Sequence, residues 1–155
     1  MAETRPLEIL VIDDDVDLSK LLVFQLEGEH VDTASGGQEG IDMYVKRLHD
    51  AETDSTKKPY DLVLTDLSMP RVSGVDVIRK VKELSPNTLV YVVTAFERTE
   101  EYDRIAKELE QLKFNGTIPK PFTMANINRI IEQVRAQITP TQNPSGYNKP
   151  QNYQS

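Results

Sequence analysis

Polar side chains follow four short apolar runs of this chain, and their types suit a divalent cation and a phosphoryl group. The runs and the residues behind them are 9–12 with Asp13 and Asp14, 62–64 with Asp66, 89–93 with Thr94, and 118–119 with Lys120. In an open parallel sheet, ligands bind in the crevice outside the carboxyl ends of the strands. The sequence therefore predicts one pocket that holds three carboxylates, a hydroxyl and an ammonium.

Asp13, Asp14 and Asp66 are the predicted metal ligands. Carboxylates that come close together repel one another, and a divalent cation relieves that repulsion. Ligands that are all oxygen favour Mg²⁺, with Mn²⁺ as the alternative. Acidic side chains also favour helix N-termini, so Asp15 and Asp17 are expected mainly to cap the helix that follows.

Asp66 is also the candidate for a covalent step. A carboxylate in a metal-bound pocket can attack phosphorus and form an acyl phosphate, and phosphoryl transfer otherwise depends on positioning and charge neutralisation. Lys120 would then pair with one phosphoryl oxygen and the Thr94 hydroxyl would hydrogen-bond another. Ala95, beside that threonine, is small enough to let the phosphoryl group approach.

Short apolar runs alternate along the chain with segments that carry apolar residues at helical spacing. The expected strands are 8–12, 30–34, 61–65, 89–93 and 116–119, and the expected helices include 16–27, 41–48, 75–84, 98–113 and 127–138. In the first helix, Leu18, Leu21, Leu22 and Leu26 are expected to share one face. Single helices between strands imply a parallel sheet, so the predicted fold class is α/β with helices on both faces.

Composition limits the classes of partner and the number of domains. The chain has 155 residues, no cysteine and a net charge of −7, which opposes non-specific binding to nucleic acid or to anionic membranes. It carries no signal-peptide pattern or long apolar span, so a cytoplasmic protein is expected. We expect one domain over 1–139, with a polar surface loop at 50–60 and a disordered polar tail at 140–155.

Four motifs occur in order at the ends of the expected strands. They are VIDDD at 11–15, DLVLTDLSMP at 61–70 followed by Gly74, VTA at 93–95 and KPF at 120–122. With them, the chain resembles the receiver domain of two-component response regulators, the CheY-like family, over about residues 7–138. The resemblance implies a flavodoxin-like (βα)5 fold.

The resemblance also implies roles for single residues. Asp66 would be the phosphoacceptor, Asp14 a direct metal ligand and Asp13 a ligand acting largely through a metal-bound water. Ser68, two residues after the phosphoacceptor, would offer its backbone carbonyl to the metal. The threonine and lysine named above would contact the phosphoryl group, and the peptide bond from Lys120 to Pro121 would be cis.

By the same resemblance, the phosphodonor would be a phosphohistidine on a sensor histidine kinase or a histidine phosphotransfer protein. The domain would catalyse only its own phosphorylation and slow dephosphorylation, so it is not expected to be an enzyme in the usual sense. Its output would be a contact with a downstream protein through the fourth helix, fifth strand and fifth helix, with no output domain on this chain.

One position departs from the family pattern. The aromatic residue that usually stands three positions before the lysine is Thr117 here, which puts ring-coupled signalling through that face in doubt. Phe114 is nearby but out of register, and ordinary core packing is its expected role.

Three other functions are compatible with parts of the sequence. A pseudo-receiver would be a binding module that never carries phosphate, and the complete set of acidic, hydroxyl and lysine residues argues against it. A phosphatase with an aspartate nucleophile would usually have a second acid where Ser68 stands. The chain could also be the receiver fragment of a longer regulator.

Overall fold

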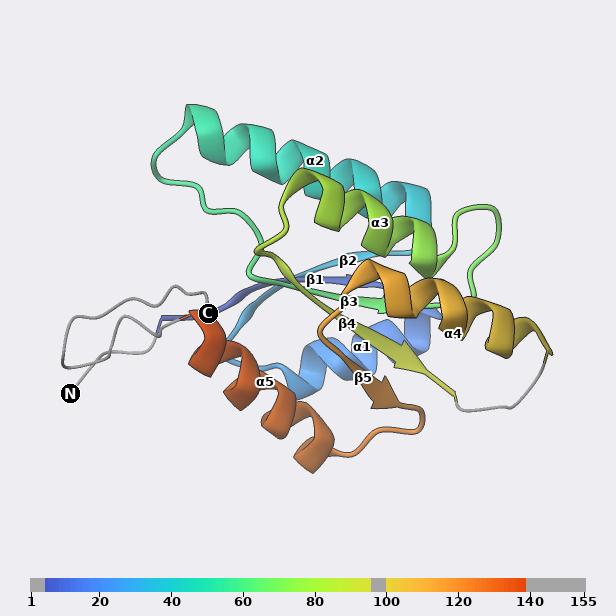
Figure 1. Cartoon of the computed structure of the whole chain (residues 1–155). Helices are drawn as coiled ribbons and strands as arrows, with labels where there is room; N and C mark the ends of the chain where they lie inside the picture. The colour runs from blue at the N-terminus through green and yellow to red at the C-terminus, as the bar shows by residue number, and fades with distance from the viewer. Residues whose placement is uncertain (1–4, 96–99, 139–155) are drawn as a thin grey trace, which may run out of the picture.

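The computed structural model describes residues 5–95 and 100–138, in which strands and helices alternate (Figure 1). The strands are β1 Glu8–Ile12, β2 His30–Ala34, β3 Leu62–Asp66, β4 Leu89–Thr94 and β5 Gly116–Pro119. The helices are α1 Val16–Gln25, α2 Gly37–Thr53, α3 Gly74–Leu84, α4 Glu100–Leu112 and α5 Met124–Ile138. This order confirms the predicted fold class, while the predicted tail at 140–155 lies outside the described residues.

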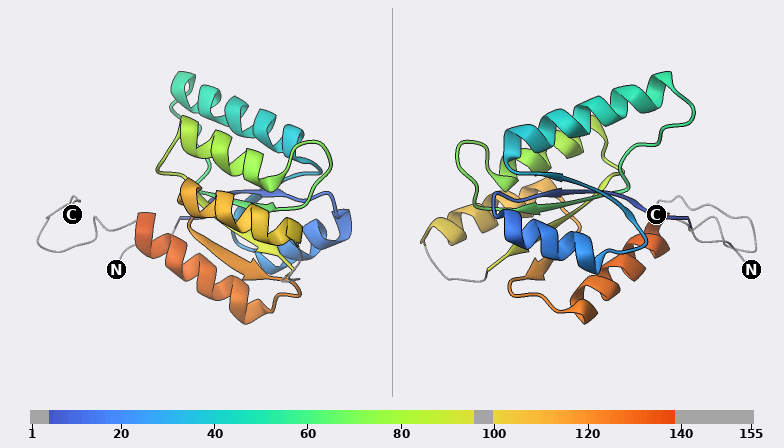
Figure 2. Two further views of the ribbon diagram at one scale, coloured as in Figure 1. Left: turned by 45° about the vertical axis from the view of Figure 1, so that its right-hand side comes forward. Right: turned by 180° about the vertical axis from the view of Figure 1, so that it is seen from behind.

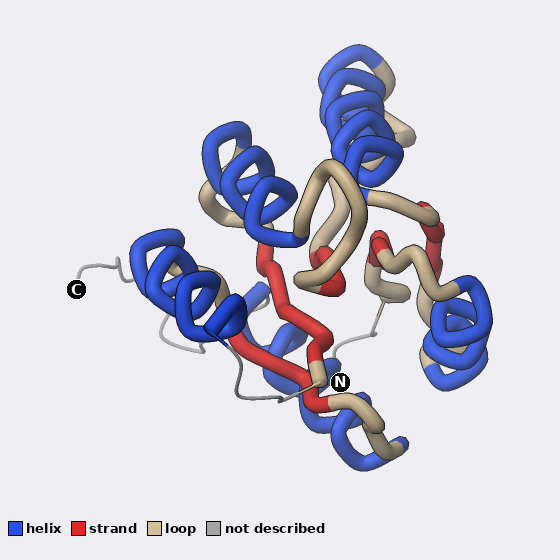
Figure 3. The backbone as a smooth tube through the Cα atoms, turned by 90° about the vertical axis from the view of Figure 1, so that its right-hand side faces the viewer, coloured by secondary structure: helices blue, strands red, loops and turns tan. Residues whose placement is uncertain are grey.

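The strands form one parallel sheet in the order β2-β1-β3-β4-β5. Figure 3 looks roughly along the strands and shows the helices on either side of them. Ile12 pairs with Thr65, and Thr94 pairs with Pro119. The carboxyl ends of β1, β3, β4 and β5 therefore lie along one edge, next to the reversal of strand order where sheets of this kind bind ligands.

Two layers of helices bury the two faces of the sheet. Helices α1 and α5 cover one face, and α2, α3 and α4 cover the other (Figure 2). Strand β3 is buried along its whole length, as expected for a strand covered on both faces. No helix among the described residues is both long and apolar enough to cross a membrane.

The ends of two helices follow from local side-chain hydrogen bonds. Asp15 caps α1 by accepting a hydrogen bond from the backbone N–H of Leu18, which confirms its predicted role. Ser73 and Asp76 form a reciprocal capping box that begins α3 just after the β3–α3 loop. The cap holds the start of α3 close to the phosphoacceptor candidate at the end of β3.

Two expectations from the sequence are wrong in detail. Residues 50–53 continue α2 rather than starting the loop at 50–60, because Ala51 and Glu52 are good helix formers. Leu21 does not share the buried face of α1: it is 45% exposed, whereas Leu22 and Leu26 are buried.

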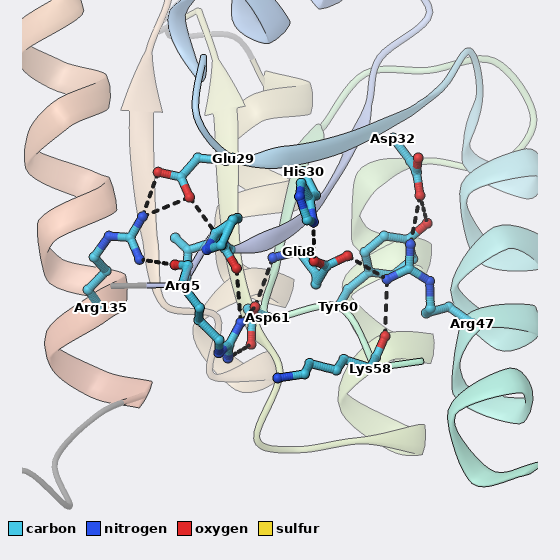
Figure 4. Close-up of polar contacts among 12 residues, drawn as sticks. Arg5, Glu8, Glu29, His30, Asp32, Arg47, Lys58, Tyr60, Asp61 and Arg135 are labelled. Carbon is cyan, nitrogen blue, oxygen red and sulfur yellow. Dashed lines mark hydrogen bonds and ion pairs between the residues drawn. The ribbon is translucent and has the colours of Figure 1, made fainter. Parts of the chain in front are cut away.

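Ionic contacts close the opposite edge of the sheet, where the strands begin (Figure 4). Arg135 of α5 donates to both carboxylate oxygens of Glu29 at 2.7 and 2.6 Å, and to the carbonyl oxygen of Arg5 at 2.8 Å. Glu29 also accepts a 2.7 Å hydrogen bond from the N–H of Leu7. These contacts fasten the last turn of α5 to the segment before β1 and to the start of β2.

A second group of polar contacts at this edge joins α2 to the sheet (Figure 4). Arg47 donates to Glu8 at 3.1 Å and to Asp32 at 3.0 Å, and its guanidinium lies 4.1 Å from the centre of the Tyr60 ring. The Tyr60 hydroxyl donates to Asp32 at 2.6 Å. Burial, and then this hydrogen bond to a carboxylate, raise the pKa of Tyr60 above its ordinary value.

Candidate functional site

The three acidic residues predicted to bind metal converge at the carboxyl edge of the sheet. Asp13 directly follows β1 and Asp66 is the last residue of the neighbouring β3. Carboxylate oxygens of Asp13, Asp14 and Asp66 all lie within 4.8 Å of one another. Asp13 is 2% and Asp66 9% exposed, whereas Asp14 is exposed. The site is thus a recessed acidic pair with a third carboxylate at its mouth.

Lys120 directly follows the outermost strand, β5, and its side chain reaches the acidic pair across the carboxyl end of β4. Its Nζ lies 3.3 Å from Asp13 Oδ2 and 3.4 Å from Asp66 Oδ1. Its backbone N–H donates to the carbonyl oxygen of Thr94 at 2.9 Å, which anchors the residue at the end of β4. The peptide bond between Lys120 and Pro121 is cis, as predicted. The lysine therefore stands between the two buried carboxylates.

Thr94 ends β4 at the same edge and is buried. Its hydroxyl donates to the carbonyl oxygen of Ala95 at 3.3 Å, which is long for a hydrogen bond of this type. Asp66 pairs in the sheet with Val93, so Thr94 lies one residue beyond its register. The hydroxyl therefore makes a weak local bond and is available to a group placed on Asp66.

Burial decides the electrostatics of the acidic pair. Burial is the largest cause that raises the pKa of Asp13, and the negative charge of Asp66 raises it further. The N–H of Asp15 and the ammonium of Lys120 lower this pKa. Burial likewise raises the pKa of Asp66 against the effect of the lysine and of the Ser68 and Leu67 N–H groups. The two ionised carboxylates are incompletely compensated and would gain from a further positive charge.

The donor set fits a hard divalent cation. Asp13 Oδ2 is buried without a hydrogen-bond partner, and a buried carboxylate oxygen of this kind commonly takes a proton, a cation or a water. Three carboxylates supply oxygen ligands and leave room for waters, as Mg²⁺ prefers. Ser68 is exposed in the loop that follows Asp66, and the role of its carbonyl stays a prediction.

Gly74 supports Asp66 in a way that the sequence pattern alone did not reveal. A Cβ at Gly74 would lie 2.1 Å from the carbonyl oxygen of Asp66 and 2.7 Å from Leu67 Cα. The Gly74 N–H donates to the carbonyl oxygen of Leu67 at 2.9 Å. The absence of a side chain at Gly74 therefore lets α3 begin directly against the backbone of Asp66. In the sequence, the only indication of this contact was a glycine placed just before a segment with helical spacing.

Thr117 and Phe114 border a hollow beside Thr94. A cavity of about 200 Å³ lies there, bounded by the end of β3, by β4 and β5, and by α4. Phe114 is half-buried and packs against the core between the sheet and helices α2–α4, so it has the core-packing role expected from the sequence. Thr117 is half-buried on β5.

Comparison of the sequence with known families identifies one match. The family described as response regulator receiver domain matches residues 9–132, which include every site residue named above. The transcriptional regulatory protein CpxR homolog of Haemophilus influenzae is 31% identical over 140 residues, covering 89% of this chain and 53% of that protein. The response regulator ArlR of Staphylococcus aureus is 28% identical over 133 residues, covering 83% of this chain and 51% of its own length. The chain thus spans about half the length of these curated relatives.

Solved structures show the same fold. A response regulator receiver domain protein from Clostridium thermocellum superposes with a TM-score of 0.71 at 26% identity, covering 86% of this chain and 98% of that one. The chemotaxis protein CheY4 of Vibrio cholerae has a TM-score of 0.67 at 21% identity, covering 83% and 98%. At that lower identity the likeness concerns the fold alone.

Proposed function

The chain belongs to the response regulator receiver domain family, and from this we propose that it is a phosphorylation-controlled switch whose phosphoacceptor is Asp66. The observation that carries the proposal is the buried pair of Asp13 and Asp66, with Lys120 Nζ within 3.4 Å of both. Receiver domains act in two-component signalling, and this geometry supports the chemistry of that family.

The proposed step is a transfer from a phosphohistidine on a partner protein. A carboxylate oxygen of Asp66 forms the new bond to phosphorus as the bond from phosphorus to the imidazole nitrogen breaks, and the electron pair stays on the imidazole. Lys120 neutralises negative charge on the phosphoryl oxygens. Thr94, which holds only a 3.3 Å bond to Ala95, donates its hydroxyl to another of these oxygens.

Asp13, Asp14, Asp66 and the backbone carbonyl of Ser68 are the residues proposed to hold Mg²⁺ at this site. The ion, with Mn²⁺ as a substitute, would offset the charge of the carboxylates and of the phosphoryl oxygens. The Oδ2 of Asp13 supports this assignment, because it is buried and forms a 3.3 Å ion pair with Lys120 but no hydrogen bond within the described part of the chain. The protein's own groups position the reacting carboxylate, so the domain acts only on its own phosphorylation and slow dephosphorylation.

The proposed partners are a sensor histidine kinase or a histidine phosphotransfer protein as donor, and a downstream protein as target. The target would bind the surface formed by α4, β5 and α5 (Figure 1). Thr94 ends β4 and Lys120 directly follows β5, so both residues lie at the carboxyl edge of the sheet beside this surface. The receiver unit is proposed to span residues 1–139. A pseudo-receiver that never takes up phosphate is the alternative that the following experiment separates.

Intact-mass spectrometry after incubation with acetyl phosphate and Mg²⁺ tests the proposal. We expect a gain of one phosphoryl group that disappears when Asp66 is replaced by asparagine or when Mg²⁺ is chelated. Asp42→Asn, which removes an exposed carboxylate of α2, is the matched control and should retain the gain. Absence of any gain with acetyl phosphate and with a panel of phosphohistidine proteins would instead support the pseudo-receiver.

A further inference from the structure

The loop between β3 and α3, residues 67–73, carries groups that serve the acidic site. The backbone N–H groups of Leu67 and Ser68 face the Asp66 carboxylate as donors, and the Ser68 carbonyl is the fourth metal ligand proposed above. Leu67 and Met69 are buried, whereas Ser68 is exposed. The path of this loop therefore decides where the Ser68 carbonyl lies relative to the three carboxylates.

The middle of the loop contains a strained turn. Arg71 has a φ of 67°, in the left-handed region that residues with a side chain seldom adopt. The Val72 N–H donates to the carbonyl oxygen of Pro70 at 2.7 Å, which closes a three-residue turn of the rare type with positive φ at its centre. Such a conformation persists only where the surrounding structure holds it, so a neighbouring element must support this part of the loop.

The start of α2 provides that support. Gly37 is buried in the first turn of α2, and a Cβ placed on it would lie 2.8 Å from Val72 Cγ1, 2.9 Å from Val72 Cβ and in overlap with the Val72 carbonyl oxygen. Val72 therefore packs directly on the backbone of α2, in the space that a side chain at position 37 would take. Next to this contact, residues 35–39 and 70–72 border a hollow of about 370 Å³, so the close approach of the two segments is local.

The same helical turn also lies against the strand that leads to Asp13. A Cβ on Gly40, one turn further along α2, would lie 2.7 Å from Cγ1 of Ile12, the last residue of β1. The first turn of α2 thus contacts both the strand end before Asp13 and the loop after Asp66. It is placed to fix these two ligand-bearing segments relative to each other.

We propose that Gly37 is a positioning residue for the metal site: by admitting Val72 against α2, it keeps the Ser68 carbonyl in place for the cation. The inference rests on the proposed function, because it concerns the ion of the same site. A side chain at position 37 would push Val72 and the loop away from α2. Residues that orient metal ligands through such contacts commonly change metal affinity by about 10–100-fold when they are replaced.

Electron paramagnetic resonance of free Mn²⁺ tests this role on the full chain, because it measures metal binding without any phosphoryl transfer. For Gly37→Ala we expect the dissociation constant for Mn²⁺ to rise by roughly tenfold. Val72→Ala removes the packing atoms from the other side of the contact without adding a clash, and it should raise the constant as well. An unchanged constant in folded Gly37→Ala would overturn the inference; if that variant does not fold, an unchanged constant in Val72→Ala does so.

Two further glycine variants separate positioning from general destabilisation. Gly36→Ala alters the preceding residue, where a Cβ meets open space, and should keep the dissociation constant of the parent chain. Gly116→Ala brings a Cβ within 2.7 Å of the Tyr91 ring, so it should lower stability at the start of β5 and still keep that constant. A loss of Mn²⁺ affinity in folded Gly116→Ala as large as the loss in Gly37→Ala would overturn the inference.

The metal dependence of phosphorylation gives a second readout. In Gly37→Ala, the Mg²⁺ concentration that gives half the maximal rate with acetyl phosphate should rise by the same factor as the Mn²⁺ constant. At saturating Mg²⁺ the rate should approach that of the parent chain, because Asp66, Thr94 and Lys120 are unchanged. A lower saturated rate with an unchanged half-maximal concentration would contradict a role in metal binding.

Mass spectrometry of the parent chain keeps the two proposals distinct. A parent chain that gains the phosphoryl group, while Gly37→Ala binds Mn²⁺ as tightly as the parent does, retains the proposed function and loses only the role of Gly37. A parent chain that binds no Mn²⁺ and takes up no phosphoryl group from any donor loses both.

Discussion

At the scale of single residues, the buried charge of Asp13 affects the stability of the metal-free chain and its affinity for a cation in opposite ways. Its carboxylate is almost fully buried, its pKa is raised mainly by that burial, and its Oδ2 has no hydrogen-bond partner. Such a charge weakens the metal-free fold and strengthens binding of a cation. Stability without metal and affinity for metal should therefore change in opposite directions when the charge is removed.

Asp13→Asn should raise the free energy of unfolding in EDTA, because it removes a buried negative charge that lies close to Asp66. The same variant should lose most of the extra stability that Mg²⁺ gives the parent chain. Urea denaturation with and without Mg²⁺ measures both effects. Asp14→Asn is the control: because its carboxylate is exposed, the variant should weaken Mg²⁺ binding with little change of stability in EDTA. An Asp13→Asn variant that is no more stable than the parent chain in EDTA would contradict the argument.

Tyr60 predicts how stability changes in alkaline solution. Burial and the hydrogen bond to Asp32 raise its pKa in the folded chain, so the folded state holds the proton after unfolded tyrosine has lost it. The contribution is complete below about pH 10, and the free energy of unfolding should fall as pH rises above that value. Tyr60→Phe should flatten this slope in denaturation curves from pH 9 to 11, roughly the range around the ordinary tyrosine value. An unchanged slope in the variant would show that Tyr60 is not its source.

At the scale of elements, the junction between β3 and α3 sets the position of Asp66. Gly74→Ala would place a methyl group 2.1 Å from the Asp66 carbonyl oxygen, so the helix or the strand end must shift. We expect a loss of about 1–3 kcal/mol in unfolding free energy and slower phosphorylation of Asp66. Gly36→Ala is the matched control: it has open space and an extended backbone, so its phosphorylation rate should match that of the parent.

Much of this architecture could be predicted from the sequence, because strands buried on both faces and amphipathic helices leave distinct patterns. Strands β2 and β5 have the predicted bounds, and the acidic residues, Thr94 and Lys120 lie at the predicted edge. The contact of Gly74 with Asp66 could not be predicted, because it depends on how closely two backbones approach. Leu21 was misplaced because α1 carries apolar residues on its exposed side as well.

At the scale of the whole molecule, one edge of the sheet holds the proposed reaction site and the opposite edge contributes to stability. The carboxyl edge carries the acidic site, while Arg135, Glu29 and Arg5 join distant parts of the chain at the other edge. Glu29→Gln should lower the free energy of unfolding by about 1–2 kcal/mol, since it removes charge-assisted bonds. Its phosphorylation rate should stay at the parent value.

Denaturation and mass spectrometry on the same samples check this division. Glu27→Gln changes an exposed neighbour and should leave stability within about 0.5 kcal/mol of the parent. A fall in phosphorylation rate for Glu29→Gln in a sample that is fully folded would show that the two edges are coupled.

The ion pairs of Lys120 with Asp13 and Asp66 also concern the order in which the chain is made. Asp13 leaves the ribosome early and Lys120 late, on opposite sides of the proposed phosphoacceptor Asp66 in the sequence. A nascent chain that has exposed Asp66 still lacks the ammonium that would neutralise the incoming group. If Asp66 accepts a phosphoryl group as proposed, we therefore expect uptake only by chains long enough to include the fifth strand and Lys120.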